Sequence, residues 1–362
     1  MENYNELYNY MMDTYGQLPV VFMKGEKSTL YDSEGKSYID FASGVGVNSL
    51  GYGDEDWKKA IKDQLNNLAH TSNIYYNAPS LKLAKKLTEE SNMDKVFFAN
   101  SGAEANETAI KIARKYSYEK YGEGRSTIIT LKKSFHGRTM ATITATGQEK
   151  FHNYFFPFLE GFKYIEANSY ESFLEAIDPS VCAIMLEAIQ GEGGVIPLED
   201  EFVQKVALKC KENDILLIMD EVQCGIGRTG LLFGFNHFDI KPDIITVAKG
   251  LASGLPISAA LANKKLSNVL KIGDHGCTFG GNALSSAAAL TVLDKVSDKG
   301  FLEKVSHKEK VIKDFFKDND SFYIKEVRGK GLMIGLEIEG EASLIQKKSL
   351  EKGLLVLTAG PN

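Results

Sequence analysis

Cysteine is scarce in this sequence, with only four among 362 residues. The four are widely spaced and form no C-x-x-C pair, so neither a disulfide framework nor a structural zinc site is indicated. The six histidines show no His-x-x-x-His spacing and do not group with the cysteines. We therefore expect no metal ion.

Long apolar runs and an excess of basic residues are absent too. No apolar stretch reaches the roughly 18 residues that indicate a membrane span. The first six residues, MENYNE, lack the basic region and the apolar run of a signal peptide. Lys and Arg total 42 against 48 Asp and Glu, a formal net charge of −6, which gives no support for nucleic-acid binding. We expect a cytoplasmic protein whose partners include neither a membrane nor a nucleic acid.

The remaining composition is that of an ordinary globular protein. Hydrophobic residues make up 43% and charged residues 25% of the chain, a balance that excludes disorder, collagen and coiled coil. At roughly 100–200 residues per domain, the length allows two or three domains.

Apolar strands and helices alternate from residue 95 onward. We expect strands at 96–99, 127–131, 162–167, 181–188, 215–220, 244–248 and 257–262, and helices at 103–121, 170–177, 201–213 and 282–296. Several of the strands are continuously apolar, which is typical of strands covered on both faces. The alternation predicts an α/β fold with a mostly parallel, doubly wound sheet.

The two ends of the chain have a different, mixed pattern. The expected elements are a helix at 2–13, strands at 20–24, 29–32 and 37–41, a helix at 56–69, a helix at 301–317, and strands at 323–327, 331–339 and 354–357. Turns are expected at Gly25-Glu26 and at 33–36. We predict a large α/β domain of residues 50–295 and a smaller α+β domain formed by residues 1–49 together with 296–362.

A capping box follows the first strand of the alternating region. Ser101 comes directly after this strand, and Glu104 three residues later predicts a helix start. Such a helix end binds phosphate readily, and the carboxyl edge of an open α/β sheet is where ligands bind. On its own, Ser101 is better explained as a helix cap.

Asp220 and Lys249 end two further apolar strands. A buried carboxylate needs a cation or several donors, so Asp220 fits a ligand-binding role and a bond to loop amides or a structural lysine equally well. A desolvated lysine loses its proton readily and attacks aldehydes, whereas a lysine at a sheet edge more commonly reaches solvent. Taken singly, neither residue decides the function.

Together, the three features fit pyridoxal phosphate (PLP). The helix end at Ser101 would hold the phosphate, Lys249 would form a Schiff base with the aldehyde, and Asp220 would pair with the ring nitrogen. Few ligands require all three groups, so the combination is much stronger evidence than its parts.

Two nearby segments have alternative interpretations. The sequence GIGRTG at 225–230 matches G-x-G-x-x-G, but no helix start follows it, so we interpret it as a flexible loop and not as a dinucleotide fingerprint. In SFHGR at 134–138, Phe135 could stack on a planar ring and Arg138 could bind a carboxylate through two hydrogen bonds. The alternative for this segment is a basic loop with an aromatic anchor. A glycosylation sequon at Asn106 lies inside an expected helix and is discounted.

The motifs together resemble the class III (ω-amino-acid) PLP-dependent aminotransferases, and within that family the acetylornithine branch. The resemblance covers nearly the whole chain and implies fold type I, with a seven-stranded large domain, a small domain and a homodimer. The segments that carry it are GVGVNSLG at 44–51, NSGAEANE at 100–107, FHGRT at 135–139, QGEGG at 190–194, DEVQ at 220–223, TFGGN at 278–282 and TAGPN at 358–362.

The resemblance implies a role for each matching residue. Lys249 binds PLP covalently, and Asp220 pairs with its ring nitrogen. Arg138 binds a substrate carboxylate, and Glu192 helps to switch the site between its two substrates. The other cofactor contacts are Ser101, Gly102 and Ala103 at the phosphate, Phe135 and Val222 on the two ring faces, Gln223 near the ring hydroxyl, and Thr278 at the phosphate of the neighbouring subunit's cofactor.

Two positions depart from the acetylornithine pattern. Cys277 stands where that branch often has a Ser or Thr in contact with substrate. Family chains also continue past the equivalent of Asn362 into a strand whose arginine binds the substrate's α-carboxylate. The sequence ends before that strand, so this contact lies either beyond it or with another residue.

The predicted reaction is transfer of the terminal amino group of N-acetyl-L-ornithine to 2-oxoglutarate, giving N-acetylglutamate 5-semialdehyde and glutamate, in arginine biosynthesis. Three alternatives stay open. One is another ω-aminotransferase, whose donor is ornithine, succinylornithine, 4-aminobutyrate or succinyl-diaminopimelate. The second is a related aminomutase, which needs no 2-oxo acid, and the third is a non-enzymatic regulatory protein that binds a cofactor.

Overall fold

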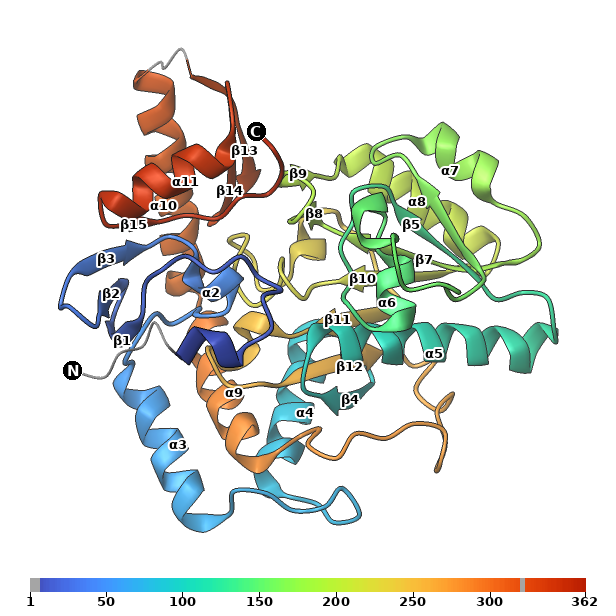
Figure 1. The fold of residues 1–362 in the computed structure, drawn as a ribbon. Helices are drawn as coiled ribbons and strands as arrows, with labels where there is room; N and C mark the ends of the chain where they lie inside the picture. The colour runs from blue at the N-terminus through green and yellow to red at the C-terminus, as the bar shows by residue number, and fades with distance from the viewer. Residues whose placement is uncertain (1–6, 320–322) are drawn as a thin grey trace.

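A seven-stranded sheet forms the centre of the structure (Figure 1). The computed structural model describes residues 7–319 and 323–362. In the strand order β4-β12-β11-β10-β7-β5-β6, β12 alone runs antiparallel to its neighbours. The predicted mostly parallel α/β sheet is therefore confirmed, with every strand within two residues of its expected bounds. The strands are β4 (Lys95–Ala99), β5 (Thr127–Leu131), β6 (Phe162–Ile165), β7 (Val181–Glu187), β10 (Leu216–Asp220), β11 (Ile244–Val247) and β12 (Ser258–Ala262).

Helices cover both faces of this sheet. Because consecutive residues of a strand point to opposite faces, Leu216 and Ile218 of β10 are buried with residues of α5, whereas Leu217 and Met219 are buried with residues of α8 and α9. Within the described ranges, no helix is long and apolar enough to cross a membrane. The helices around the sheet are α4 (Ala78–Ser91), α5 (Gly102–Tyr121), α6 (Met140–Ala145), α7 (Tyr170–Ala176), α8 (Asp200–Glu212) and α9 (Ala283–Val296).

Both ends of the chain meet in a second, smaller sheet, at the left of Figure 1. Its order is β1-β2-β3-β15, and β15 from the end of the chain lies parallel to β3. The division into domains of 50–295 and 1–49 with 296–362 stays a prediction. The elements of these regions are β1 (Phe22–Glu26), β2 (Thr29–Asp32), β3 (Ser37–Asp40), α2 (Ser43–Gly46), α3 (Glu55–Asn67), α10 (Lys299–Asp318), β13 (Ile324–Lys330), β14 (Met333–Ile338), α11 (Ala342–Glu351) and β15 (Leu354–Leu355).

Short elements complete the loops that follow the central strands. They are the 3-10 helices η1 (Tyr8–Tyr10), η2 (Glu149–Phe151), η3 (Gly234–His237) and η4 (Lys249–Ala252), and the two-residue strands β8 (Ile189–Gln190) and β9 (Ile196–Pro197). The loop at 225–230 contains no helix, in agreement with its interpretation as a loop. Most of its residues are buried, however, so it is packed into the structure and not a flexible surface segment.

Two expectations at the beginning of the chain need correction, and one helix further along was not expected. Residues 2–6 of the helix predicted at 2–13 lie outside the described residues, and the described part contains only η1. Gly25-Glu26 belongs to β1, because the chain reverses one residue later, where Lys27 has a φ of 54°. The sequence analysis missed α4, although Asn77 caps it by accepting a hydrogen bond from the Ser80 N–H at 2.9 Å.

A buried carboxylate anchors η3 behind the end of β10. Glu221 is fully buried, and its two oxygens accept hydrogen bonds from the backbone N–H groups of Gly234 (2.6 Å) and Phe235 (2.7 Å). Burial raises the pKa of Glu221 to about 7, although the two hydrogen bonds oppose the rise. The carboxylate therefore stabilises a loop junction at an electrostatic cost.

The stability of the Glu221→Gln variant relative to wild type should increase as the pH rises from 5 to 8. In wild type, the Glu221 carboxyl loses its proton near the ordinary pKa of 4.5 in the unfolded chain and near 7 in the folded chain. The stability that this group contributes below pH 4.5 is therefore lost as the pH rises through 7. At about 1.4 kcal/mol per pH unit, the difference in unfolding free energy should move by up to ~3 kcal/mol.

Urea denaturation at the two pH values measures this difference. Glu123→Gln, which changes an exposed carboxylate after α5, is the matched control and should show no such movement. If the difference in unfolding free energy between Glu221→Gln and wild type stays constant between pH 5 and pH 8, the raised pKa of Glu221 is contradicted.

Candidate active site

The first part of the site is the beginning of α5. Ser101 caps this 20-residue helix: its Oγ accepts a hydrogen bond from the Glu104 N–H (3.2 Å) and donates one to Glu104 Oε2 (2.8 Å). The predicted capping box is therefore present. The free N–H groups of Gly102 and Ala103 follow the carboxyl end of β4, where a helix N-terminus attracts an anion.

Gly102 packs so closely against Val222 that no side chain fits between them. A Cβ added to Gly102 would lie 2.6 Å from Val222 Cγ1 and 3.0 Å from its Cγ2. Val222 comes two residues after Asp220, so this contact joins the start of α5 to the end of β10. The phosphate-binding candidate and the carboxylate candidate are thus held against each other.

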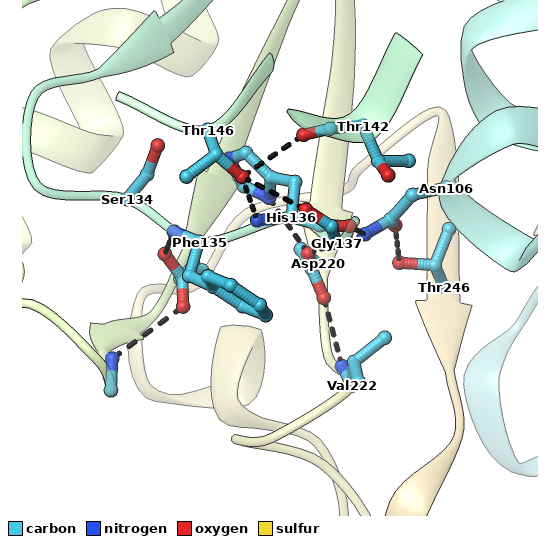
Figure 2. A network of polar contacts seen from close by, with 12 residues as sticks. Asn106, Ser134, Phe135, His136, Gly137, Thr142, Thr146, Asp220, Val222 and Thr246 are labelled. Carbon is cyan, nitrogen blue, oxygen red and sulfur yellow. Dashed lines mark hydrogen bonds and ion pairs between the residues drawn. The ribbon is translucent and has the colours of Figure 1, made fainter. Parts of the chain in front are cut away.

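Asp220 lies at the centre of a buried polar network (Figure 2). Its side chain is 3% exposed. Oδ2 accepts hydrogen bonds from Asn106 Nδ2 (2.8 Å) and from His136 Nδ1 (2.7 Å), and Oδ1 accepts one from the Val222 N–H (3.0 Å). Asn106 is held in turn by the Thr246 hydroxyl, which donates to its Oδ1 at 2.7 Å. Three donors therefore fix the orientation of the carboxylate.

His136 is the only titratable partner among these three donors. Because a carboxylate can only accept, His136 Nδ1 carries the proton in this contact. Burial opposes the charged form of His136, but the hydrogen bond and the charge of Asp220 outweigh it, and the net direction of its pKa is upward. Its Nε2 is buried and has no hydrogen-bond partner within the part of the chain that the structure describes.

Lys249 follows β11, the strand beside β10. Asp220 pairs in register with Thr246, three residues before Lys249, so both side chains lie at the same edge of the sheet. The lysine is half-buried and, among the described residues, makes no hydrogen bond or ion pair. Its φ of +40° is unusual for a residue with a Cβ, and such strain is concentrated at functional sites.

Phe135 and Gln223 lie at the same edge. Phe135 is half-buried, and Figure 2 places it and Val222 on either side of Asp220. Gln223 is held between two glycines: a Cβ on Gly191 would lie 1.6 Å from Gln223 Oε1, and one on Gly46 would lie 3.9 Å from its Cγ. These positions agree with the contacts expected for the ring, which stay predictions.

The four remaining predicted residues have fewer contacts. The exposed Arg138 lies with its guanidinium 3.9 Å from the centre of the Phe151 ring. Glu192 is half-buried and Thr278 is exposed, and neither has a polar partner within the described ranges. Cys277 accepts a hydrogen bond from Asn100 Nδ2 at 3.1 Å, beside the start of α5, and burial raises the pKa of its thiol. The structure thus brings Cys277 to the phosphate candidate, and no contact joins it to Arg138.

Sequence reasoning missed the partners of Asp220. The sequence analysis places Asn106 in a family motif and in a discounted sequon, and it assigns no role to Asn106, His136, Thr246 or Glu187. One signal could have found Asn106: it is a polar residue on the apolar side of α5, next to the buried Ala105 and Ala109. An amide on the buried side of a helix needs a partner.

The residues of this site fit PLP. A helix N-terminus packed against Val222, a fixed carboxylate, and a lysine with no polar partner among the described residues are the groups that a phosphorylated aromatic aldehyde requires. Ser101, Gly102 and Ala103 would hold its phosphate, Asp220 its ring nitrogen and Lys249 its aldehyde. The fold and the site therefore define a fold type I PLP-dependent transferase.

Comparisons with known proteins give the family. The sequence model of the class III aminotransferases matches residues 10–362, so the chain belongs to this family. An acetylornithine aminotransferase of Caldanaerobacter subterraneus subsp. tengcongensis is 52% identical over 98% of this chain and 90% of that protein. One of Haemophilus ducreyi is 49% identical over 97% of this chain and 89% of that protein.

Solved structures agree with this assignment. The N-acetylornithine aminotransferase of Stenotrophomonas maltophilia has a TM-score of 0.85 and 37% identity, over 99% of this chain and 90% of that one. The ornithine aminotransferase of Toxoplasma gondii has a TM-score of 0.95 and 30% identity, over 100% of this chain and 89% of that one. A further structure of the Toxoplasma enzyme contains PLP at partial occupancy. The chain is a PLP-dependent aminotransferase.

Replacing Gly102 with Ala should weaken PLP binding. The added methyl group would press on Val222, and overpacking of this kind costs roughly 1–3 kcal/mol, which corresponds to a loss of affinity of roughly 5- to 150-fold. Titration of the protein with PLP, followed by absorbance, measures the dissociation constant. In a Val222→Ala background, where the methyl group has room, the Gly102→Ala change should cost less. An equal cost in both backgrounds would contradict the contact.

Proposed function

We propose that this enzyme transfers the terminal amino group of N-acetyl-L-ornithine to 2-oxoglutarate, in arginine biosynthesis. The observation that carries the aminotransferase chemistry is the placement of Lys249 and Asp220 on neighbouring strands beside the start of α5. Support for the donor comes from the eight acetylornithine aminotransferases that are 42–52% identical over nearly the whole chain.

The chain's own residues would divide the work as follows. When bound, PLP supplies an aldehyde that takes up an amino group and a ring that accepts electrons. Asp220, oriented by its three donors, would hold the ring nitrogen and favour its charged form. Lys249 Nζ would act as general base and then as general acid, removing the proton from the carbon that carries the donor's amino group and delivering it to the aldehyde carbon of the cofactor. Phe135 and Val222 would hold the two faces of the ring.

Arg138 is the candidate for a substrate carboxylate. Its guanidinium is exposed and lies over the Phe151 ring, and it has no carboxylate partner within the described residues, so its planar donors are available to a ligand. Glu192 is half-buried and without a partner in the same ranges. We propose that a carboxylate there attracts the donor's terminal ammonium in one half-reaction and turns away from the 2-oxo acid, whose carboxylates it would repel, in the other.

Ornithine is the second candidate donor. It is favoured by the TM-score of 0.95 with the Toxoplasma ornithine aminotransferase, whereas the acetylornithine relative from Stenotrophomonas has 0.85. Sequence identity favours acetylornithine, with 52% for a relative of that name against 30% for the Toxoplasma enzyme. We give sequence identity more weight, because the fold is common to many donors whereas specificity depends on individual side chains.

We further propose a cytoplasmic homodimer in which Thr278 reaches the partner's phosphate. Thr278 is exposed and is followed by Phe279, which is 58% exposed. Asn73 lies in the loop before α4 and connects that loop to the Thr278 loop, because its side chain donates hydrogen bonds to the carbonyls of Cys277 and Gly280. The exposed apolar residues of the two loops are Ile74, Tyr75, Tyr76 and Phe279. An exposed apolar cluster of this kind is typical of a protein interface, and a second copy would bury it beside Thr278.

Lys249→Ala should abolish turnover and leave the protein folded. The change removes a side chain at the sheet edge that contacts no polar partner in the described ranges, so no buried group loses its partner. PLP should still bind through the start of α5 and Asp220. Borohydride treatment followed by peptide mass spectrometry should label wild type at Lys249 and leave the variant unlabelled. Label on another lysine of the wild-type protein would refute the assignment.

The ratio kcat/KM should be at least tenfold higher for N-acetylornithine than for ornithine or 4-aminobutyrate. The free α-ammonium of ornithine would approach Arg138, and 4-aminobutyrate lacks the acylamino group altogether. Arg138→Lys should raise KM for acetylornithine more than it weakens PLP binding, because lysine cannot form the paired hydrogen bonds. Steady-state kinetics with the three donors measures both effects. A tenfold preference for ornithine would replace the proposed donor without affecting the aminotransferase assignment.

A further inference from the structure

A second buried carboxylate lies beside Asp220. Glu187 is the last residue of β7, and it pairs in register with Asp220 at the end of β10. The side chains of paired residues in a parallel sheet project from the same face. Glu187 is only 4% exposed, and no role for it follows from the reaction as described above.

The contacts of Glu187 join two loops of the active site. Its Oε2 accepts a hydrogen bond from the Phe135 N–H at 3.0 Å, and its Oε1 accepts one from the Gly191 N–H at 3.5 Å. Phe135 carries the ring that faces the cofactor site, and Gly191 comes directly before Glu192. One carboxylate therefore connects the residue on the ring face to the residue that is expected to distinguish the two substrates.

The two backbone groups that contact the Glu187 carboxylate are both hydrogen-bond donors, which explains why a glutamate and not a glutamine occupies this position. An ionised carboxylate accepts two N–H groups at once. A glutamine in the same place would have to direct its NH₂ group at one of them and leave that donor without a partner, which is costly in a buried site. Burial raises the pKa of Glu187 to about 7, while the charge of His136 lowers it and that of Asp220 raises it. At pH 8 the group is therefore mostly ionised.

The loops that carry Phe135 and Gly191 cannot move freely to replace a hydrogen bond lost at Glu187. A Cβ on Gly191 would lie 1.6 Å from Gln223 Oε1, and the Gln190 side chain donates to the Lys132 carbonyl at 2.8 Å. On the far side, Arg328 Nε of β13 donates to the Gly194 carbonyl at 2.7 Å. The loop at 190–194 is therefore held between the cofactor side and the β13–β14 hairpin, and Glu187 is its attachment on the cofactor side.

We propose that Glu187 is a positioning residue of the transamination, which fixes Phe135 and the Glu192 loop relative to each other through its two backbone hydrogen bonds. This inference rests on the proposed function. It assigns to Glu187 no contact with substrate and no proton transfer.

Glu187→Gln tests the proposal against a matched control. Glu221→Gln changes a carboxylate that is equally buried, also accepts two backbone N–H groups and also has a pKa of about 7, but contacts η3 and neither loop. At pH 8, kcat/KM for N-acetylornithine and for 2-oxoglutarate should each fall at least tenfold in Glu187→Gln and stay within twofold of wild type in Glu221→Gln. The visible circular dichroism of bound PLP should change only in Glu187→Gln.

Amide hydrogen exchange of the PLP-loaded proteins gives a reading that does not depend on activity. Peptides covering 132–137 and 188–195 should exchange at least fivefold faster in Glu187→Gln, and the peptide covering 232–238 should do so in Glu221→Gln. Glu187→Asp keeps the charge but is too short to span both donors, so it should give an intermediate effect. Glu187→Asp also provides the test of the proposal if Glu187→Gln does not fold.

Unchanged kinetics and unchanged exchange in the two loops of Glu187→Gln would overturn the proposal. A general loss of protection across the sheet, equal in both Gln variants, would overturn it too, because Glu187 would then be structural only. A wild-type protein that does not turn over N-acetylornithine would instead refute the proposed function, and because the exchange and circular-dichroism readings do not depend on the donor, the two failures are distinguishable.

Discussion

The active site depends on keeping the Asp220 carboxylate ionised and correctly oriented inside the protein. An isolated buried charge is very costly, and the structure meets that cost with one backbone N–H, the Asn106 amide and the His136 ring. Each donor comes from a different element: the loop after β10, helix α5 and the loop after β5. The carboxylate therefore orders three segments around the place where the ring nitrogen would bind.

The order of the strands places the other groups around that carboxylate. Because β10 lies between β7 and β11, the carboxyl ends of the three strands present Glu187, Asp220 and Lys249 side by side. The close contact of Gly102 with Val222 brings the start of α5 to the same edge. The start of α5, a carboxylate and a lysine thus meet through backbone topology, and only a few side-chain contacts are needed to adjust their positions.

Much of this arrangement could be predicted from the sequence. The continuous apolar strands predicted the sheet. Ser101, Asp220 and Lys249 follow or end such strands, and they were predicted to lie close together because the carboxyl ends of parallel strands share one edge. Helix α4 was missed because it buries only a narrow stripe, Leu83, Leu87 and Ser91, and it packs mainly against α9, a segment about 200 residues away in the sequence. The role of Asn106 could not be read from its local motif, because the contact with Asp220 joins residues 114 positions apart. Contacts between distant segments, such as Glu187 with Phe135, are set by register in the sheet and have no local signature.

The most direct test of this account is the rate of the first half-reaction in Asp220→Asn. Saturated with PLP and mixed with N-acetylornithine, this variant should retain the lysine-bound cofactor absorbance but react roughly ten- to hundredfold more slowly than wild type. Loss of one charge-assisted hydrogen bond, worth ~1.5–3 kcal/mol, already corresponds to that factor. An amide whose oxygen still accepts from Asn106 and His136 would also turn its NH₂ group toward the Val222 N–H, leaving two donors facing each other. A PLP-loaded Asp220→Asn protein that reacts at the wild-type rate would contradict the central role of this charge.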